Sequence, residues 1–224
     1  MRVAVFDAYG TLFDVGGALR AAAEAEPEAP WATDWAALAR NWRQKQLEIT
    51  WLRAVAGHHA DFAQVTADAL DWTLARAGLS DPDLRARLLD LYGRLPPYPE
   101  ARAAVEAVAA RGLPCAILTN ATPAMVTGLL DASGLGPLFG EVLTVEEAGV
   151  FKPHPSVYAL VTAHYGVAPD EVLFASANGW DAAGASGFGF QTAWINREGA
   201  PTDRLWAKPW RELSSLRGIA GLIG

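Results

Sequence analysis

At 224 residues and 51% hydrophobic composition, the chain is long enough to bury a large core and to fold by itself. Its formal charge of −7 comes without any run of basic residues, which argues against nucleic-acid binding. No stretch is long and apolar enough for a leader peptide or a membrane span, and the lone Cys115 excludes an intrachain disulfide, so we expect a cytoplasmic protein without a membrane partner.

The first predicted element is a short strand that ends in a carboxylate. Val3, Val5 and Phe6 form an apolar run typical of a central parallel strand, and Gly10 marks the break after it. Asp7 therefore lies at the carboxyl end of the strand, which in open α/β sheets is the edge where ligands bind. This stretch alone leaves two interpretations open: Asp7 caps the following turn, or it takes part in a reaction.

Residues 16–97 carry helical patterns and little that indicates a strand. One helix is predicted after Thr33, a candidate cap residue, and two more are predicted over 62–78 and 81–95. This stretch is therefore predicted to be a helical insertion. Three prolines then form a stiff connector that marks a domain boundary: Pro96, Pro97 and Pro99.

From Glu100 onward, helical and strand patterns alternate along the chain. This alternation predicts an α/β fold, namely a doubly wound, Rossmann-like parallel-sheet core with an inserted helical cap domain. The core comprises residues 1–15 and 98–224, and the cap comprises residues 16–97. The strand-forming segments are 114–120, 141–145, 171–181 and, as the last, 190–196.

Polar side chains follow several of the predicted strands, where the doubly wound topology would bring them to one crevice. Taken singly, each has an ordinary explanation as a helix cap, a turn residue or a surface lysine. Four groups of such residues occur in an order along the chain that coincidence does not readily explain. The groups are Asp7, then Thr119 with Asn120, then Lys152, and then Ser176 with Asn178 and Asp181.

This order resembles the haloacid dehalogenase superfamily, whose motifs are an Asp-led DxxGT, a Ser or Thr, a Lys and an acidic loop. The strings FDAYGTLFD, WRQKQLEITWLR, FKPHPSVY and SANGWD are similar to the L-2-haloacid dehalogenase branch in particular. Phosphatases of the superfamily carry a second Asp two places after the nucleophile, where this chain has Tyr9. That difference favours a dehalogenase, because a halide leaves as a stable anion and needs no proton.

The resemblance implies a role for each charged residue. Asp7 matches the nucleophile, which attacks carbon 2 of the substrate and forms an ester. Lys152 matches the lysine that keeps this carboxylate charged, and Arg43 matches the arginine that meets the departing halide. Thr119 and Asn120 match the pair that holds the substrate carboxylate, although the family usually has Ser at the first position.

The resemblance also implies positioning and pocket residues. Ser176, Asn178 and Asp181 match the group that positions the ester and the hydrolytic water, and either Asp181 or Lys152 activates that water. Thr11 and Tyr158 match supporting positions. Five residues match the lining of the substrate pocket, although such side chains are usually core residues: Tyr9, Gln44, Leu47, Phe62 and Trp180.

We therefore expect a hydrolase that converts short L-2-haloalkanoic acids into D-2-hydroxy acids without a metal or an organic cofactor. Its partners would be the 2-haloacid substrate and halide ion, and the resemblance implies a homodimer. One alternative is a phosphatase of the same superfamily, with magnesium held partly by Asp181. A second is an inactive member that binds carboxylates or a protein partner.

Overall fold

The computed structural model describes residues 1–224 and is built around one parallel sheet. The strand order is β3-β2-β1-β4-β5-β6, and every neighbouring pair is parallel. The predicted doubly wound fold is thus confirmed. The strands are β1 (Val3–Phe6), β2 (Cys115–Thr119), β3 (Glu141–Thr144), β4 (Val172–Ser176), β5 (Gln191–Ile195) and β6 (Arg211–Leu213).

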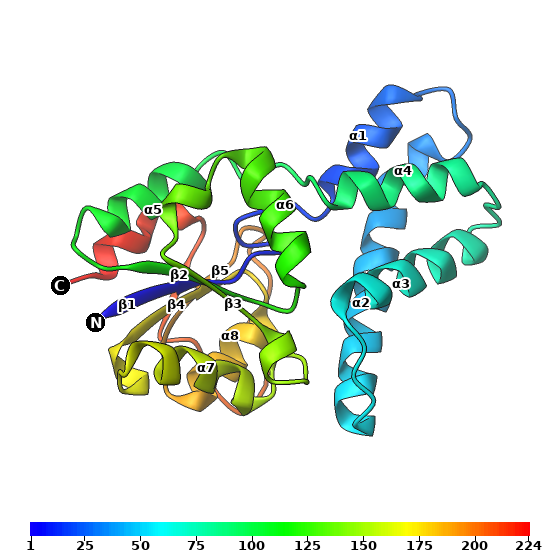
Figure 1. Ribbon diagram of the computed structural model, residues 1–224. Coiled ribbons are helices and arrows are strands. Elements are labelled where there is room, and N and C mark those ends of the chain that lie inside the picture. Colours follow the sequence, from blue (N-terminus) through cyan, green and yellow to red (C-terminus); the bar gives the residue numbers. More distant parts are fainter.

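Helices cover both faces of the sheet (Figure 1), which explains why its central strands are apolar along their whole length. One face is covered by α5 (Ala101–Ala109), α6 (Pro123–Ser133) and the 3₁₀ segment η5 (Leu216–Leu222). The opposite face is covered by α7 (Pro155–Tyr165) and α8 (Gly179–Phe188). The shorter 3₁₀ segments are η1 (Ala32–Asp34), η2 (Gly136–Leu138), η3 (Val145–Glu147) and η4 (Pro169–Glu171).

Two elements were not anticipated from the sequence. The sheet continues beyond the expected last strand into β6, three residues with no apolar run that pair with β5 through the backbone. The glycine-rich segment before β5 forms α8, which includes residues 179–181 of the segment predicted as a strand, because β4 already ends at Ser176. A Cβ on Gly184 would lie 2.4 Å from the Tyr158 hydroxyl, so α7 and α8 can approach only where this side chain is absent.

The strand order reverses between β1 and β4, which are neighbours in the sheet. A ligand crevice is expected at this switch point, beyond the carboxyl ends of the strands. Asp7 follows β1 and Ser176 ends β4, so the two lie on either side of the reversal. The sheet therefore places the predicted nucleophile at the usual binding edge of the fold.

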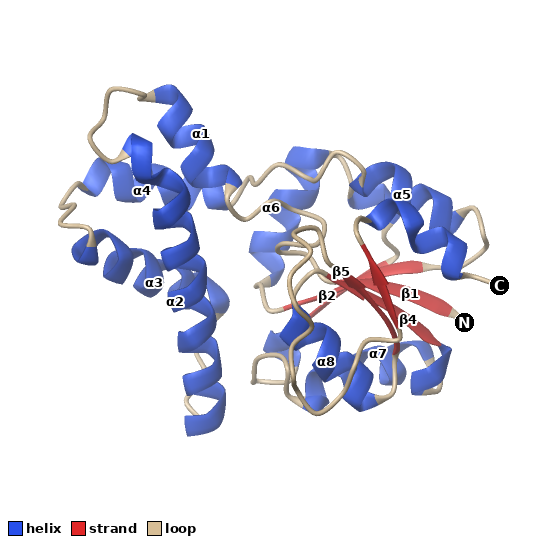
Figure 2. Ribbon diagram, turned by 180° about the vertical axis from the view of Figure 1, so that it is seen from behind, coloured by secondary structure: helices blue, strands red, loops and turns tan.

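The carboxyl ends of the strands point toward a separate group of helices that the chain forms between β1 and β2 (Figure 1). These are α1 (Gly17–Ala25), α2 (Trp35–Ala56), α3 (Phe62–Arg76) and α4 (Pro82–Tyr92). The long α2 packs along α3 and faces the sheet edge (Figure 2). Asp34, rather than the expected Thr33, directly precedes α2, and its side chain makes no capping hydrogen bond.

The two connections between the helical group and the sheet run side by side. Tyr98 N donates to Leu12 O at 2.8 Å, Asp14 N donates to Pro96 O at 2.9 Å, and Phe13 forms a β-bridge with Pro97. The proline connector is therefore paired with the chain that leaves β1. The two connecting segments are thus hydrogen-bonded to each other next to the loop that follows Asp7.

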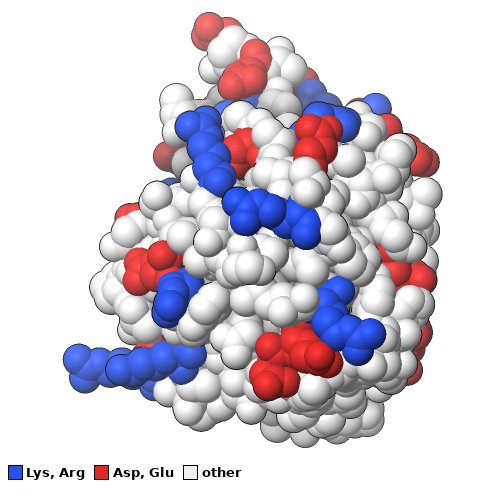
Figure 3. All heavy atoms as spheres, turned by 90° about the vertical axis from the view of Figure 1, so that its left-hand side faces the viewer, with Lys and Arg blue, Asp and Glu red and all other residues white.

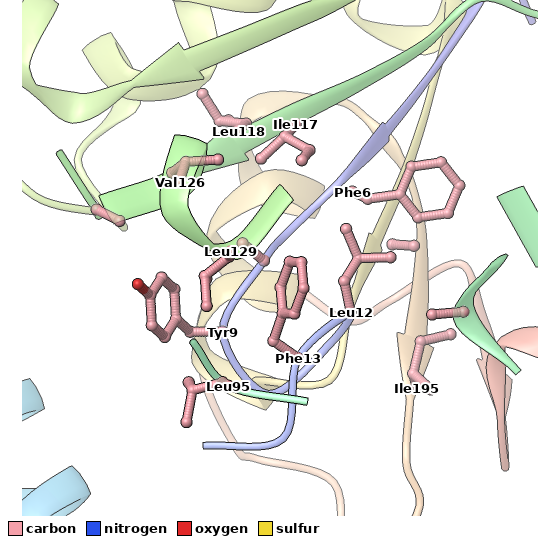
Figure 4. Close-up of a cluster of buried hydrophobic side chains, with 14 of the residues drawn as sticks. Phe6, Tyr9, Leu12, Phe13, Leu95, Ile117, Leu118, Val126, Leu129 and Ile195 are labelled. Carbon is pink, nitrogen blue, oxygen red and sulfur yellow. The ribbon is translucent and has the colours of Figure 1, made fainter. Parts of the chain in front are cut away.

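The core surrounds the loop that follows β1. Figure 4 shows Phe6, Leu12 and Phe13 packed among apolar side chains of β2 and α6, and Tyr9 at the margin of this cluster with its hydroxyl pointing away. On the molecular face that carries both chain ends, basic and acidic side chains are interspersed (Figure 3). None of the helices combines the length and the apolar character that crossing a membrane requires.

Candidate active site

A lysine between two carboxylates forms the centre of the site. Lys152 Nζ donates to Asp7 Oδ1 at 3.1 Å and to Asp181 Oδ2 at 2.9 Å. Lys152 is 1% exposed, Asp181 is 0% exposed and Asp7 is 5% exposed. Three charges are thus held in a nearly dry environment, in which they interact far more strongly than in water. Asp7 alone of the three keeps some access to solvent.

Burial and the neighbouring charges shift the pKa values in this group. Burial is the largest influence on Lys152 and by itself lowers its pKa, but the charges of Asp181 and Asp7 outweigh it, so the pKa is raised overall. Burial raises the pKa of Asp181 above its ordinary value, against the opposing effect of Lys152. The lysine is therefore charged at neutral pH and compensates the adjacent carboxylates.

Two further donors hold the other oxygen of Asp7. The Thr11 hydroxyl donates to Asp7 Oδ2 at 2.8 Å, and Asn178 Nδ2 donates to the same oxygen at 2.9 Å. Thr11 Oγ1 also accepts from Ala177 N at 2.8 Å, which ties the loop after β1 to the loop after β4. Gly10 makes the tight loop possible, because its φ of +88° lies in the left-handed region that favours glycine.

Ser176 and Tyr158 contact this centre from behind. Ser176 Oγ accepts from Asn178 N at 3.2 Å and so shapes the turn that presents the Asn178 amide to Asp7. The Tyr158 hydroxyl donates to Asp181 Oδ1 at 2.8 Å, and burial raises its pKa well above the ordinary value. Both oxygens of Asp181 are therefore engaged, one by Lys152 and one by Tyr158.

The carboxyl end of β2 brings Thr119 and Asn120 close to Lys152. Asn120 Oδ1 accepts from the backbone N of Lys152 at 3.0 Å, which leaves its Nδ2 group available to another acceptor. Thr119 is buried, and its Oγ1 accepts from Ala121 N at 3.2 Å. The hydroxyl hydrogen of Thr119 is free to point elsewhere. The carboxyl end of β2 therefore offers two donors, the Thr119 hydroxyl and Asn120 Nδ2, of which Asn120 lies against the backbone of Lys152.

Arg43 reaches the sheet edge from α2. Its Nη2 donates to Asn178 Oδ1 at 3.3 Å, and Asn178 in turn contacts Asp7, so one amide links the guanidinium to the carboxylate. Arg43 and Leu47 line an open cleft together with Gly10 and Asn178. A fixed cation thus faces the site from the helical side.

Aromatic rings enclose the region between α2 and the Asp7 loop. Tyr9 stacks on Tyr92 with ring centroids 5.4 Å apart, and it meets Phe62 edge-on at 5.8 Å. The Tyr9 hydroxyl is buried and has no hydrogen-bond partner. Trp180 lies further out, edge-on to Trp51 at 5.6 Å, in an apolar groove of about 550 Å³.

Gln44 is not brought to this site. It is exposed, and it lines a depression on the outer surface with Lys45, Glu48 and other polar residues. The α2 side chain that faces inward is Gln46, which is fully buried and accepts from Arg43 Nη1 at 2.8 Å. The sequence contained one signal for Gln46: it lies three residues after Arg43, and residues three apart lie on the same helix face.

Arg197 was not predicted from the sequence as a site residue, and it stabilises the loop after β1. Its Nη2 donates to Thr11 O at 3.0 Å and to Glu100 Oε1 at 2.8 Å, and its guanidinium lies over the Tyr98 ring. No sequence motif predicts this contact, because Arg197 follows β5 and lies far from Thr11 in the chain.

Replacing Lys152 by methionine is expected to destabilise the fold in a pH-dependent way. Without the ammonium, the pKa of Asp181 rises further. A carboxyl group with a raised pKa in the folded state makes the fold less stable as the pH increases, because its ionisation is easier in the unfolded chain. The deficit should thus grow above the ordinary carboxyl pKa of 3.8 and reach about 3–5 kcal/mol at pH 8, typical of breaking a buried pair. Thermal melts between pH 5 and pH 8 measure it.

The exposed Lys208 supplies the matched control, because Lys208→Met removes the same charge from the surface. That variant should melt close to the unmodified protein at both pH values. A Lys152→Met deficit that is equal at the two pH values would contradict the electrostatic explanation.

A doubly wound sheet with a buried aspartate–lysine–aspartate group at its switch point and a helical insertion over that edge defines a class of hydrolases with an aspartate nucleophile. A family model described as haloacid dehalogenase-like hydrolase matches residues 1–189. The chain belongs to this family, and the resemblance read from its motifs is confirmed.

Particular relatives narrow the comparison. The chain is 40% identical over 220 residues to an (S)-2-haloacid dehalogenase of Pseudomonas putida, covering 98% of this chain and 95% of that protein. It also matches a crystal structure of a dehalogenase with an intermediate complex, at 37% identity and a TM-score of 0.94, over 100% of this chain and 97% of the other.

A third similar protein is the L-2-haloacid dehalogenase of Xanthobacter autotrophicus, solved with chloropropionic acid covalently bound. It is 37% identical with a TM-score of 0.88, and the match covers 100% of this chain and 98% of that chain. Both structural matches extend over the sheet and the helical insertion, so the similarity is not limited to the common core.

Proposed function

We propose that this protein hydrolyses short L-2-haloalkanoic acids to D-2-hydroxy acids through an ester formed on Asp7. The observation that carries the proposal is the Asp7 carboxylate itself, which accepts hydrogen bonds from Lys152, Thr11 and Asn178 at a nearly dry sheet edge that Arg43 faces. The similarity to (S)-2-haloacid dehalogenases over the whole chain supports it.

In the first step, Asp7 attacks carbon 2 of the substrate and the carbon–halogen bond breaks. Oδ1 accepts one hydrogen bond and Oδ2 accepts two, so Oδ1 has more of its electron density available for attack. The halide departs opposite the attacking oxygen, toward Arg43. A preorganised cation at that place stabilises the negative charge as it develops. The halide needs no acid, which is consistent with Tyr9 in place of a second carboxylate.

In the second step, water attacks the Asp7 carboxyl carbon, and we assign one of its protons to Asp181, whose pKa is raised by burial, with Lys152 between the two carboxylates as the connecting group. The bond from the carboxyl carbon to the substrate oxygen then breaks, and the proton on Asp181 passes to that oxygen, which leaves as the 2-hydroxy acid. The second proton of the water is lost to solvent when the Asp7 carboxylate is restored. Asn178 and Ser176 hold the ester in place for this attack, and Tyr158 orients Asp181.

Substrate recognition follows from the remaining side chains around Asp7. Thr119 and the free Nδ2 of Asn120 would hold the substrate carboxylate, because both can donate beside Lys152. Tyr9, Leu47 and Phe62 would surround the alkyl group and the halogen, and we retain Trp180 as a pocket residue that would approach them from the neighbouring apolar groove. The pocket role expected for Gln44 is not proposed, because its side chain faces the outer surface.

L-2-chloropropionate is expected to yield chloride and D-lactate, with one inversion at carbon 2, because the second step never touches that carbon. Chiral chromatography of the product and a chloride assay measure this, with D-2-chloropropionate and phosphate esters as comparison substrates. The rate should be the same in excess chelator. L-lactate as product would contradict the two-step route. Phosphate release that requires magnesium would favour the phosphatase alternative, and no turnover of any substrate would favour the inactive one.

We also propose that residues 16–97 form a cap domain over a core of residues 1–15 and 98–224, and that the protein is a cytoplasmic homodimer. The paired chain crossings at Leu12–Asp14 and Pro96–Tyr98 support the division. The free, buried Cys115 is consistent with a reducing compartment. The dimer rests on the family resemblance.

A further inference from the structure

The helical group contains a buried polar pair, Gln46 and Thr66, to which the proposed reaction assigns no role. Gln46 is fully buried in α2, and Thr66 is buried in α3 opposite it. Gln46 Nε2 donates to Thr66 Oγ1 at 2.7 Å, while Gln46 Oε1 accepts from Arg43 Nη1 at 2.8 Å and from the Tyr92 hydroxyl at 3.2 Å. Both polar atoms of the amide are thus engaged.

The orientation of the Gln46 amide is decided by Thr66. The Thr66 hydroxyl donates its only hydrogen to Phe62 O at 2.6 Å, so its oxygen can only accept from Gln46. The amide must therefore turn its NH₂ group toward Thr66 and its oxygen toward Arg43. The opposite orientation would set a donor against the guanidinium. A hydroxyl that does not contact Arg43 thus selects the acceptor that Arg43 meets.

The same chain of contacts continues across the boundary between the helical group and the sheet. Arg43 Nη1 is held by Gln46, and Nη2 is held by Asn178 Oδ1 at 3.3 Å. Asn178 Nδ2 donates to Asp7 Oδ2 at 2.9 Å. The planar guanidinium is thereby fixed at two corners, one on each side of the site, and Tyr92, the second donor to Gln46, stacks on Tyr9.

We propose that Gln46, oriented by Thr66, is a positioning residue that aims the Arg43 guanidinium at the departing halide. The inference rests on the proposed dehalogenation, since it concerns the cation of that reaction. Its physical basis is that a flexible arginine has many rotamers, and a charge that must stabilise a developing anion acts fully only when it is held in place beforehand. Misplacement by about 1 Å can lower a catalytic rate by about 10²-fold.

The test compares Thr66→Val with Thr66→Ser, because valine keeps the shape and removes the hydroxyl, whereas serine keeps the hydroxyl. The readout is the maximal rate of halide release in a single turnover with enzyme in excess, for L-2-chloropropionate and L-2-iodopropionate. Thr66→Val is expected to slow chloride release about 10-fold or more and iodide release less, since a poorer leaving group depends more on the cation. The substrate concentration at half-maximal rate should change little, and Thr66→Ser should restore the rate.

Thr73→Val is the matched control. Thr73 is also buried in α3, and its hydroxyl donates to Ala69 O at 2.8 Å in the same way, but the structure gives it no contact with Gln46. It should release both halides at nearly the unmodified rate. Gln46→Met, which keeps the length of the side chain and removes the amide, should show the same selective loss as Thr66→Val and decides the matter where that variant is unfolded.

The proposal is overturned by an equal slowing of both halides in Thr66→Val, by no slowing, or by the same selective loss in Thr73→Val. An unmodified protein that releases neither halide would instead contradict the proposed function, so the two failures are distinguishable.

Discussion

Asp7→Asn is expected to lower halide release by about 10⁴-fold or more, the largest effect of any single change in this protein. The carboxamide is a poor nucleophile and cannot form the ester. It also presents an NH₂ group where all three partners of Asp7 are donors: Lys152, Thr11 and Asn178. The variant should retain the helical and strand content of the parent, because Asp181 still compensates Lys152. Steady-state chloride release and circular dichroism measure the two effects.

Isotope labelling of the unmodified protein tests the same residue without a substitution. In a single turnover of L-2-chloropropionate with enzyme in excess, carried out in water labelled with oxygen-18, the label should enter the Asp7 side chain. The reason is that water attacks the carboxyl carbon of the ester. Mass spectrometry of the peptide that contains VFDAYG detects it. Label that appears in the lactate while Asp7 stays unlabelled would mean that water attacks the substrate directly, and the Asp7 ester would have to be abandoned.

Arg43→Lys is expected to lower turnover by about 10²-fold or more while the melting temperature stays close to that of the parent. The guanidinium spans two acceptors, Gln46 Oε1 at 2.8 Å and Asn178 Oδ1 at 3.3 Å. A lysine ammonium is a compact charge and cannot reproduce this planar fork, so it would not stand in the same place when the halide departs. Removing one preorganised charge-stabilising donor typically costs a factor of this size.

Arg40→Lys is the matched control, because Arg40 lies on α2 nearly one turn earlier and is exposed. That variant should keep nearly full turnover. Thermal melts and halide release on the same samples separate the effects. Near-normal turnover of Arg43→Lys would place this arginine outside the reaction, whereas an equal loss of stability and activity would indicate a structural role only.

Much of the fold was predictable because it depends on local patterns. Every residue of the run before Asp7 is apolar, so both faces of the strand must be buried, which indicates a central parallel strand. The alternation of helix and strand patterns after Glu100 allows few topologies other than a doubly wound sheet. Two elements were missed: β6 carries no apolar run, and α8 is rich in glycine, of which Gly184 serves close packing against Tyr158.

The composition of the site was also predictable in part, because strand ends in this fold meet at one edge. Asp7 and Lys152 are 145 positions apart in the chain, yet each follows a recognisable motif, and the sheet brings them to 3.1 Å. The combination of burial and neighbouring charges that shifts the pKa values of Lys152 and Asp181 could not be known from the motifs. It depends on which side chains pack around the group.

The sequence by itself thus determined the doubly wound sheet apart from its edge strand β6, the helical insertion, and the charged residues that meet at the sheet edge, since these follow from apolar periodicity and motif order. Only the tertiary structure decided which way the side chains of α2 face. Periodicity places Arg43 and Gln46 on one side of the helix, but the rotation of the helix about its axis is set by its packing against α3. That packing turns Gln44 to the surface and Gln46 inward to Thr66, so the contact between Gln46 and Arg43 could be identified only once the two helices were in place.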